Sequence, residues 1–250
     1  MKKGRVIIYW DYELQKGADM DNSKSWGLED YKQTKWLLKT LEKYDVKCCF
    51  AVLGYAAEKG ELPYNASEQI KKMAEEGHEI ASHSYTHREL TKLNEKEIVW
   101  ELKKSKEVLE KLTGKKVVTF VPPWNKPFSF FGLSVDAGKK PMPWIWPSKL
   151  KISRLCELLY KTGYKKCRLY NIHNKIFRRN IASEIKEIKG IECYYSNTGS
   201  GFGKDARGCV LSSIKENKVA VLYEHPHQLK CKNVRMNFLD LMKFINKIVV

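Results

Sequence analysis

Three of the six histidines in the chain lie within ten positions, in the stretch GHEIASHSYTHREL (residues 77–90). His83 ends a short apolar run, and His87 follows four residues later. This separation brings both imidazoles to one point if the chain turns helically after His83. Two imidazoles and one carboxylate are a standard ligand set for a catalytic divalent ion. The pair therefore indicates a metal site, in which Ser84 and Thr86 are expected to hydrogen-bond the loop and fix the ring tautomers. The same spacing also fits histidines that hold no metal.

Carboxylates that could complete such a site follow the first apolar run, RVIIYWDYE. Asp11 and Glu13 are two positions apart at the end of this run, a spacing that places both side chains on one face of a strand. Two carboxylates this close repel each other unless a cation lies beside them. A metal ion would supply that cation. The alternative is a solvated strand end whose carboxylates form surface salt bridges.

The third candidate for chemistry is His225, which ends the apolar run KVAVLYEH. An imidazole titrates near neutral pH, so a histidine at the end of a strand is a candidate general acid. The alternative is a partly buried histidine that is hydrogen-bonded to a loop carbonyl. His227 is expected to be exposed, and His78 to be a structural or surface histidine.

Segments with the patterns of strands and helices alternate along the chain. The expected strands are 5–13, 46–54, 78–84, 117–121, 165–170 and 218–225, and the expected helices are 25–45, 67–77, 94–114, 149–164 and 237–249. Ser67 is the expected N-cap of one helix, and Asn94 with Glu97 resembles a capping box. This order predicts an α/β fold with a parallel sheet, either a barrel or a doubly wound sheet. The carboxyl ends of the strands then share one mouth, where the candidate residues would meet.

The composition is that of a folded globular protein, with 43% hydrophobic residues in a chain of 250. One domain over residues 1–250 is the simplest organisation. Residues 122–148 hold six of the eight prolines and three tryptophans, so a long irregular loop is expected there. The formal charge of +17 favours anionic partners, but most of the excess is lysine on helix faces. No recognition motif accompanies this charge, and nucleic acid is not an expected partner.

The seven cysteines are odd in number and have no regular spacing, so neither a disulfide framework nor a Cys-x-x-Cys zinc site is expected. A reducing compartment fits this cysteine content best. The N-terminal apolar run is too short for the core of a signal peptide, and no apolar span approaches the thickness of a membrane. We therefore expect a cytoplasmic protein.

Five segments resemble, in their order and intervals, the motifs of the polysaccharide deacetylases, carbohydrate esterase family 4. They are RVIIYWDYE, VKCCFAVLG, EEGHEIASHSYTHREL, VVTFVPPWN and VAVLYEHP. The resemblance is dense over residues 5–125 and returns near 219–229. It implies a distorted (β/α)7-type barrel that forms a single catalytic domain. It also implies a metal-dependent hydrolase that removes acetyl from an N-acetylated sugar.

The resemblance further implies a role for each candidate residue. The implied roles are base for Asp11, general acid for His225, metal ligand for Glu13, His83 and His87, and substrate contact for Pro123, Trp124 and Tyr223. In this reading Trp124 stacks on a sugar ring and Tyr223 lies against the acetyl methyl group. The metal is one divalent ion, with zinc expected first and cobalt, nickel or manganese as alternatives.

Two positions depart from the usual motifs of the family. The first motif commonly has two adjacent aspartates, but Tyr12 stands at the second place, so the chain looks like the variant with acid, spacer and acid. The third motif usually begins with an Arg that pairs with the catalytic Asp, and Val121 stands in its place. Either another cation, such as Arg88 or Arg207, supplies that contact, or the base is tuned differently.

The leading hypothesis is an intracellular, metal-dependent carbohydrate N-deacetylase. Its expected substrate is a soluble or lipid-linked glycan precursor, the latter at a membrane surface, which the basic protein surface would suit. One alternative is a catalytically impaired, carbohydrate-binding member of the family. Another is a hydrolase of a non-sugar amide on the same fold. The sequence leaves the sugar and the oligomeric state open.

Overall fold

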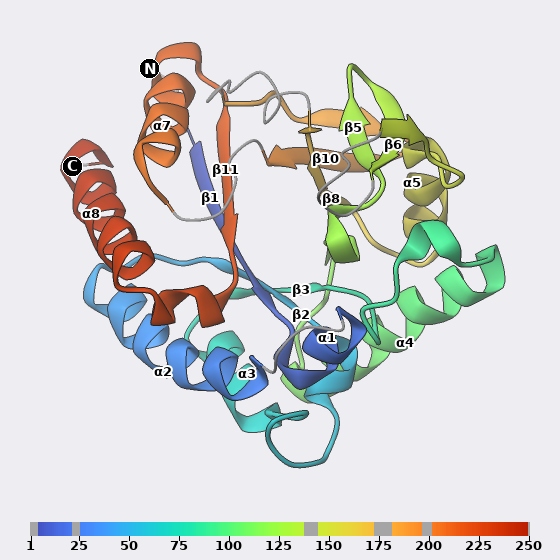
Figure 1. Cartoon of the computed structure of the whole chain (residues 1–250), viewed down its shortest axis with the longest axis horizontal. Coiled ribbons are helices and arrows are strands. Elements are labelled where there is room, and N and C mark those ends of the chain that lie inside the picture. The colour runs from blue at the N-terminus through green and yellow to red at the C-terminus, as the bar shows by residue number, and fades with distance from the viewer. Residues whose placement is uncertain (1–4, 22–25, 138–144, 173–181, 197–201, 250) are drawn as a thin grey trace.

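The structure, a computed structural model, describes residues 5–21, 26–137, 145–172, 182–196 and 202–249. A curled, eight-stranded sheet forms its centre (Figure 1). The strand order is β11 (Val219–Glu224), β1 (Arg5–Tyr12), β2 (Cys49–Val52), β3 (Glu79–Ser82), β4 (Thr119–Phe120), β8 (Lys166–Tyr170), β10 (Ile191–Ser196) and β9 (Lys186–Ile188). Seven of these strands run parallel, and β9 pairs antiparallel with β10. The predicted α/β class with a distorted seven-stranded parallel barrel is confirmed.

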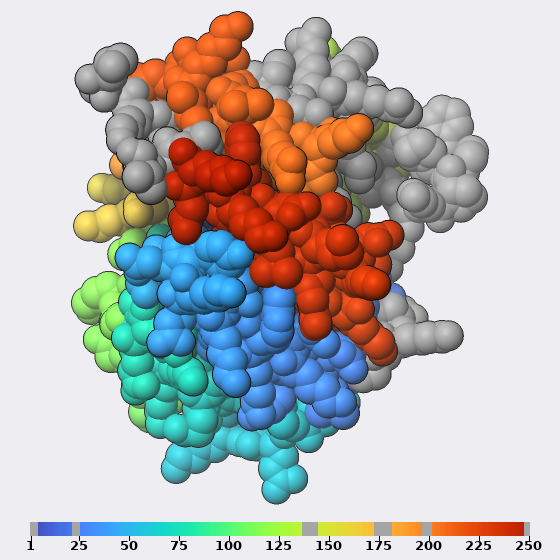
Figure 2. Space-filling model, turned by 90° about the vertical axis from the view of Figure 1, so that its left-hand side faces the viewer, coloured from blue at the N-terminus to red at the C-terminus, as the bar shows by residue number. Residues whose placement is uncertain are grey.

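The barrel is incompletely closed between β10 and β11. These strands lie near each other, but among the described residues no hydrogen-bonded ladder joins them. On the outside, α8 (Lys232–Val249) follows β11 and packs on α2 (Gly27–Lys43), with the rings of Phe238 and Trp36 6.4 Å apart. Figure 2 shows α8, in red, lying against α2, in blue. Through Phe238, whose ring centroid lies 5.2 Å from that of Trp10, α8 also packs on β1, the strand that supplies the predicted base.

Alternate side chains of β1 separate two apolar cores. Trp10 and Tyr12 are fully buried in the core between the sheet and the helices. Tyr9 belongs to a second core inside the barrel, and Asp11, two residues further on, points to the same interior. The remaining helices with bounds are α1 (Leu14–Met20), α3 (Ser67–Glu75), α4 (Glu95–Thr113), α5 (Ile152–Lys161) and α7 (Lys204–Glu216). No helix within the described ranges has both the length and the apolar character needed to cross a membrane.

The two ends predicted for α4 are present, whereas the last helix, predicted from residue 237, begins at Lys232, and the predicted N-cap Ser67 is corrected. Asn94 and Glu97 form a capping box at the start of α4, and the helix ends at Gly114, whose φ of 67° is left-handed. Ser67 is the first residue of α3, and Ala66 is its N-cap. The prediction for Ser67 was wrong because the N-cap is the residue before it, so Ser67 already lies in the first turn of the helix.

Residues 122–148 contain regular structure, contrary to the irregular loop that their proline content predicts. Strands β5 (Phe128–Phe130), β6 (Leu133–Ala137) and β7 (Ile145–Pro147) form a second, antiparallel sheet. The prolines are compatible with it because they lie at strand ends: Pro127 precedes β5, and Pro147 ends the edge strand β7. Residues 138–144 lie outside the described part of the chain.

Candidate metal centre and its cavity

The two histidines of the loop after β3 converge, but by a different path from the predicted helical turn. The strand ends at Ser82, and the next residues form a loop in which Ser84 and His87 have left-handed φ values of 64° and 65°. The Ser84 hydroxyl accepts a hydrogen bond from the His87 backbone N–H at 3.1 Å. The centroids of the two imidazole rings are 5.0 Å apart. Reversing the chain within four residues requires these unusual backbone angles, which sequence spacing alone does not reveal.

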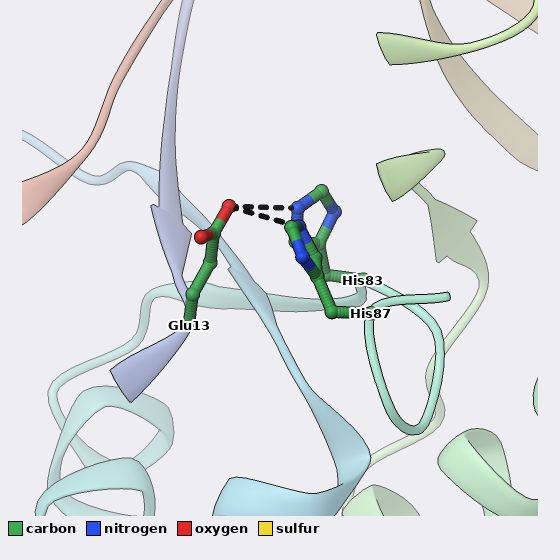
Figure 3. Close-up of side chains that lie close together, drawn as sticks. All are labelled: Glu13, His83 and His87. Carbon is green, nitrogen blue, oxygen red and sulfur yellow. Dashed lines mark hydrogen bonds and ion pairs between the residues drawn. The ribbon is translucent and has the colours of Figure 1, made fainter. Parts of the chain in front are cut away.

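Glu13 points into the same space, directly after β1 (Figure 3). Its Oε1 lies 3.3 Å from Nε2 of His83 and 3.1 Å from Nε2 of His87. Tyr12 points the other way, and its hydroxyl donates to Oε1 of Gln69 at 2.6 Å. The predicted placement of Asp11 and Glu13 on one face of the chain is therefore found.

The three side chains fit a divalent cation. Their ligand atoms all lie within 4.8 Å of one another, a property that no other group of His, Cys, Asp or Glu shares in the described part of the chain. Two ligands at about 2.1 Å from a tetrahedral ion are about 3.4 Å apart, close to the two distances from Glu13. Nε2 of His87 is near Glu13 but is not aimed at it, so within the described ranges neither ring nitrogen of His87 has a hydrogen-bond partner. A buried imidazole left without partners is expected where a metal is to be bound.

The tautomer of His83 is fixed by a residue that the sequence did not suggest. Nδ1 of His83 lies 2.9 Å from the carbonyl oxygen of Val121, which can only accept, so Nδ1 carries the proton. Nε2 is then free to face Glu13, in the arrangement typical of metal-binding histidines. Ser84 hydrogen-bonds the loop, as predicted, by accepting from the His87 backbone N–H, whereas the Thr86 hydroxyl donates to the buried carboxylate of Glu101.

Asp11 forms a buried ion pair with Arg168 of β8. The guanidinium donates two hydrogen bonds to Asp11, at 2.7 Å and 2.8 Å, and a third to Oδ1 of Asn125 at 3.0 Å. Arg168 is fully buried, and its guanidinium lies 4.4 Å from the ring centroid of Tyr223. Neither Arg88 nor Arg207 pairs with Asp11, because these exposed side chains pair with Glu97 and Asp240.

Val121 and Arg168 occupy the same level of the barrel. Strands β4 and β8 pair with Phe120 beside Cys167, and continuing this register by one residue sets Val121 beside Arg168. The cation that the resemblance places at residue 121 is therefore one strand away. A sign of this was present in the sequence, because an Arg inside the strand KKCRLY must find a carboxylate if both faces of the sheet are covered.

His225 extends from the end of β11 toward Glu13. Its Nε2 lies 3.3 Å from Oε1 of Glu13, and its Nδ1 lies 3.6 Å from the buried carboxylate of Glu224. Burial by itself would lower the pKa of His225, but the carboxylates of Glu13 and Glu224 raise that pKa well above its usual value. The structure thus brings His225, Glu13 and Asp11 to one site from the ends of two neighbouring strands.

The two acids of the site are ionised for different reasons. Burial would raise the pKa of both carboxyls. The Arg168 guanidinium, followed by His83, lowers the pKa of Asp11 below its ordinary value. The imidazoles of His87 and His225 hold the pKa of Glu13 well below its usual range. Both carboxylates are therefore charged near neutral pH, one paired with a fixed cation and the other facing imidazoles.

These side chains line a cavity of about 290 Å³. Its walls include Asp11, Glu13, His83, His87, Trp124 and His225. Trp124 has a left-handed φ of 62°, and its indole N–H donates to the carbonyl oxygen of His87 at 3.2 Å. Pro123 and Tyr223, also predicted to contact substrate, lie behind this wall: Pro123 is buried, and Tyr223 packs on Arg168.

His227 lines the cavity, whereas the sequence suggested an exposed residue. Its Nδ1 and its backbone N–H both lie 2.9 Å from Oδ1 of the buried Asp30. Its ring stacks on Trp26 with centroids 4.8 Å apart. His78 is buried away from the cavity and accepts a hydrogen bond from the Cys48 backbone N–H at 3.3 Å, as expected for a structural histidine.

Comparison with known proteins finds similarity to polysaccharide deacetylases. The family model for polysaccharide deacetylase matches residues 26–127. A peptidoglycan-N-acetylglucosamine deacetylase from Bacillus cereus is 35% identical over 97 residues, which cover 39% of this chain and 33% of the relative. A peptidoglycan deacetylase from Helicobacter pylori is 33% identical over 88 residues, which cover 35% and 28% of the two chains. The chain thus spans about a third of the length of these curated relatives.

Similarity of fold extends much further along the chain. The crystal structure of a candidate polysaccharide deacetylase from Mycobacterium smegmatis has a TM-score of 0.69 at 16% identity, covering 98% of this chain and 85% of that one. The family match contains His83, His87 and Trp124, but it does not contain Asp11, Glu13 or His225. The fold of the chain brings Asp11, Glu13 and His225 into the same cavity.

Proposed function

We propose that this chain, whose residues 26–127 match the polysaccharide deacetylase family model, is a metal-dependent hydrolase that removes an N-acetyl group from an amino sugar. In this proposal Glu13, His83 and His87 hold the metal, Asp11 is the base, and His225 is the general acid. One observation carries it: a possible metal site, an arginine-paired carboxylate and a third histidine face one cavity. A divalent ion, when bound, polarises a carbonyl and makes water acidic near neutral pH.

Asp11 is suited to take the proton from the attacking water. Its carboxylate is ionised, and two hydrogen bonds from Arg168 fix its plane. The pair also limits the basicity of Asp11, since the guanidinium lowers its pKa. A weak base would be sufficient for a water that a bound divalent ion would make more acidic. Arg168 thus acts as a positioning residue, in the role that the resemblance assigns to position 121.

His225 is suited to protonate the departing nitrogen, because an amine leaves poorly as an anion. The carboxylates around it favour the imidazolium form, which holds the proton needed for this step. Trp124 offers an aromatic wall beside the proposed ligand His87, with ring centroids 5.2 Å apart. An indole face at this position supports a sugar as substrate, since sugar rings stack on aromatic side chains. The products would be acetate and a free amino sugar.

The proposal extends to the metal, the substrate and the compartment. Zinc suits two imidazoles and one carboxylate, with cobalt, nickel or manganese as alternatives. The N-acetylated substrate would be a glycan or glycan precursor, including a lipid-linked precursor at a membrane surface, where the net charge of +17 favours anionic lipids. The seven cysteines, six of them buried thiols, support a cytoplasmic location.

The direct test is acetate release from N-acetylglucosamine oligomers by the protein loaded with zinc. We expect one zinc per chain, release that stops when the metal is removed by a chelator, and recovery when zinc is added back. Loss of Glu13 in Glu13→Ala should lower zinc occupancy and acetate release together. Wild-type protein that binds zinc and sugar but releases no acetate would support the carbohydrate-binding alternative instead.

The role of His225 predicts a particular dependence on pH. An acid catalyst works below its pKa, so kcat/KM should fall as the pH rises through the pKa of His225, above its ordinary value of about 6.5. Glu224 contributes to raising that pKa, so Glu224→Gln should move this alkaline limb to lower pH. The measurement is kcat/KM against pH for both proteins. An unchanged alkaline limb in Glu224→Gln would assign the limb to another group.

A further inference from the structure

The loop between the two proposed histidine ligands is attached to a buried carboxylate on α4. Oε2 of Glu101 accepts hydrogen bonds from the backbone N–H groups of Tyr85 and Thr86, both at 2.8 Å. Its Oε1 accepts one from the Thr86 hydroxyl. Glu101 is fully buried, and the cavity lining does not include it. All of these bonds go to the residues that connect His83 to His87.

The chain around the third proposed ligand has a matching attachment on α2. Oδ2 of Asp30 accepts hydrogen bonds from the backbone N–H groups of Glu13 at 3.3 Å and Leu14 at 3.0 Å. Its Oδ1 accepts two from His227, from the backbone N–H and from Nδ1, each at 2.9 Å. Asp30 is fully buried as well. It therefore joins the loop after β1 to the loop that carries His225.

We propose that Asp30 and Glu101, here called the two carboxylate braces, are positioning residues that set the affinity of the site for its metal. The inference rests on the metal-binding role proposed for Glu13, His83 and His87. Two separate helices thus fix the two backbone segments that bring these ligands together. Groups one step behind the ligands commonly matter in this way, because a ligand held in place loses less freedom when the metal binds.

The backbone at these loops gives a physical reason for the braces. The φ values of Ser84, His87 and Leu14 are 64°, 65° and 52°. Residues other than glycine seldom adopt this left-handed region. Such angles persist only where surrounding contacts compensate for them. Each brace supplies that compensation by accepting two consecutive backbone N–H groups, which would otherwise be buried without an acceptor. Without a brace, the loops are free to relax and the ligand atoms to separate.

The two braces differ in what can replace them. One of the three donors to Glu101 is a hydroxyl, which can turn and accept from an amide. Glu101→Gln therefore keeps every hydrogen bond, while Glu101→Met keeps the shape and loses the acceptors. All four donors to Asp30 are N–H groups. In Asp30→Asn the single carbonyl oxygen can accept from only one pair of them, and in Asp30→Leu no oxygen is left to accept from either pair.

The test measures zinc affinity of the metal-free protein by titration against a competing chelator. We expect Glu101→Met and Asp30→Leu to bind zinc about 10–100-fold more weakly than wild type, Asp30→Asn to lie between, and Glu101→Gln to match wild type. If Glu101→Met does not fold, Glu101→Asp replaces it, because shortening the side chain withdraws the acceptor while keeping the charge. Glu101→Asp should then bind zinc more weakly than Glu101→Gln.

The matched control is Glu110→Met, on the same helix. Glu110 also accepts a backbone N–H, from Val117 at 2.9 Å, but that segment carries none of the proposed ligands. Its loss should lower the unfolding temperature of the metal-free protein and leave zinc affinity unchanged. If Glu101→Met and Asp30→Leu behave like this control, the braces serve only stability and the inference is wrong. If wild type itself binds no zinc, the metal role proposed for the site fails instead.

Discussion

Asp11→Asn is expected to lower kcat by about 10²–10⁴-fold while zinc affinity stays at the wild-type level. The asparagine amide keeps the size of the side chain but has almost no basicity, so it cannot take a proton from water. Asp11 is separate from the possible metal site of Glu13, His83 and His87, so the ligand set is intact. Single-turnover acetate release and zinc titration on the same preparation would measure the two quantities.

The control for this substitution is Asp136→Asn, which removes another carboxylate that has a cationic partner. Asp136 lies 2.7 Å from Lys126 and does not line the cavity. Its loss should leave kcat close to that of wild type. Activity retained in Asp11→Asn would exclude Asp11 as the base, and a simultaneous loss of zinc would assign it to the metal instead.

Arg168→Met is expected to destabilise the fold by about 3–5 kcal/mol, because it leaves the Asp11 carboxylate buried without its partner. Chemical denaturation of the metal-free protein would measure this. The double variant Asp11→Asn/Arg168→Met should be more stable than Arg168→Met alone, since no unpaired charge remains. Equal stability of these two variants would show that packing of the arginine, not the ion pair, accounts for the loss.

The same pair predicts how stability depends on pH. The pKa of Asp11 in the folded state is lowered, so its contribution is present above the unfolded-state pKa of about 3.9. That contribution is lost as the pH falls through the lowered folded-state value. In Arg168→Met, burial raises the pKa of Asp11, so this variant should lose less stability than wild type on acidification. Arg168→Lys, which keeps the charge but not the two parallel bonds, should fall between them.

The sequence by itself determined the local elements and the residue types of the site. Period-two spacing predicted that Asp11, in β1, and Glu13, directly after it, lie on one face of the chain, because successive side chains of a strand alternate. The capping residues Asn94 and Glu97 marked the start of α4 because they act within a few residues of each other. The alternation of strands and helices predicted the parallel α/β fold, since parallel neighbours need crossover connections.

Tertiary structure alone decided which distant groups meet. Arg168 pairs with Asp11 across 157 positions of sequence, and only the register of β8 beside β4 sets it at the level of Val121. Asp30 reaches both Glu13 and His227 because α2 packs on the loop after β11. In the sequence, a carboxylate that will be buried inside a helix cannot be distinguished from a solvent-exposed acid. Only the packing of the helices on the barrel buries Asp30. Once buried, its oxygens need hydrogen-bond donors, which come from two loops.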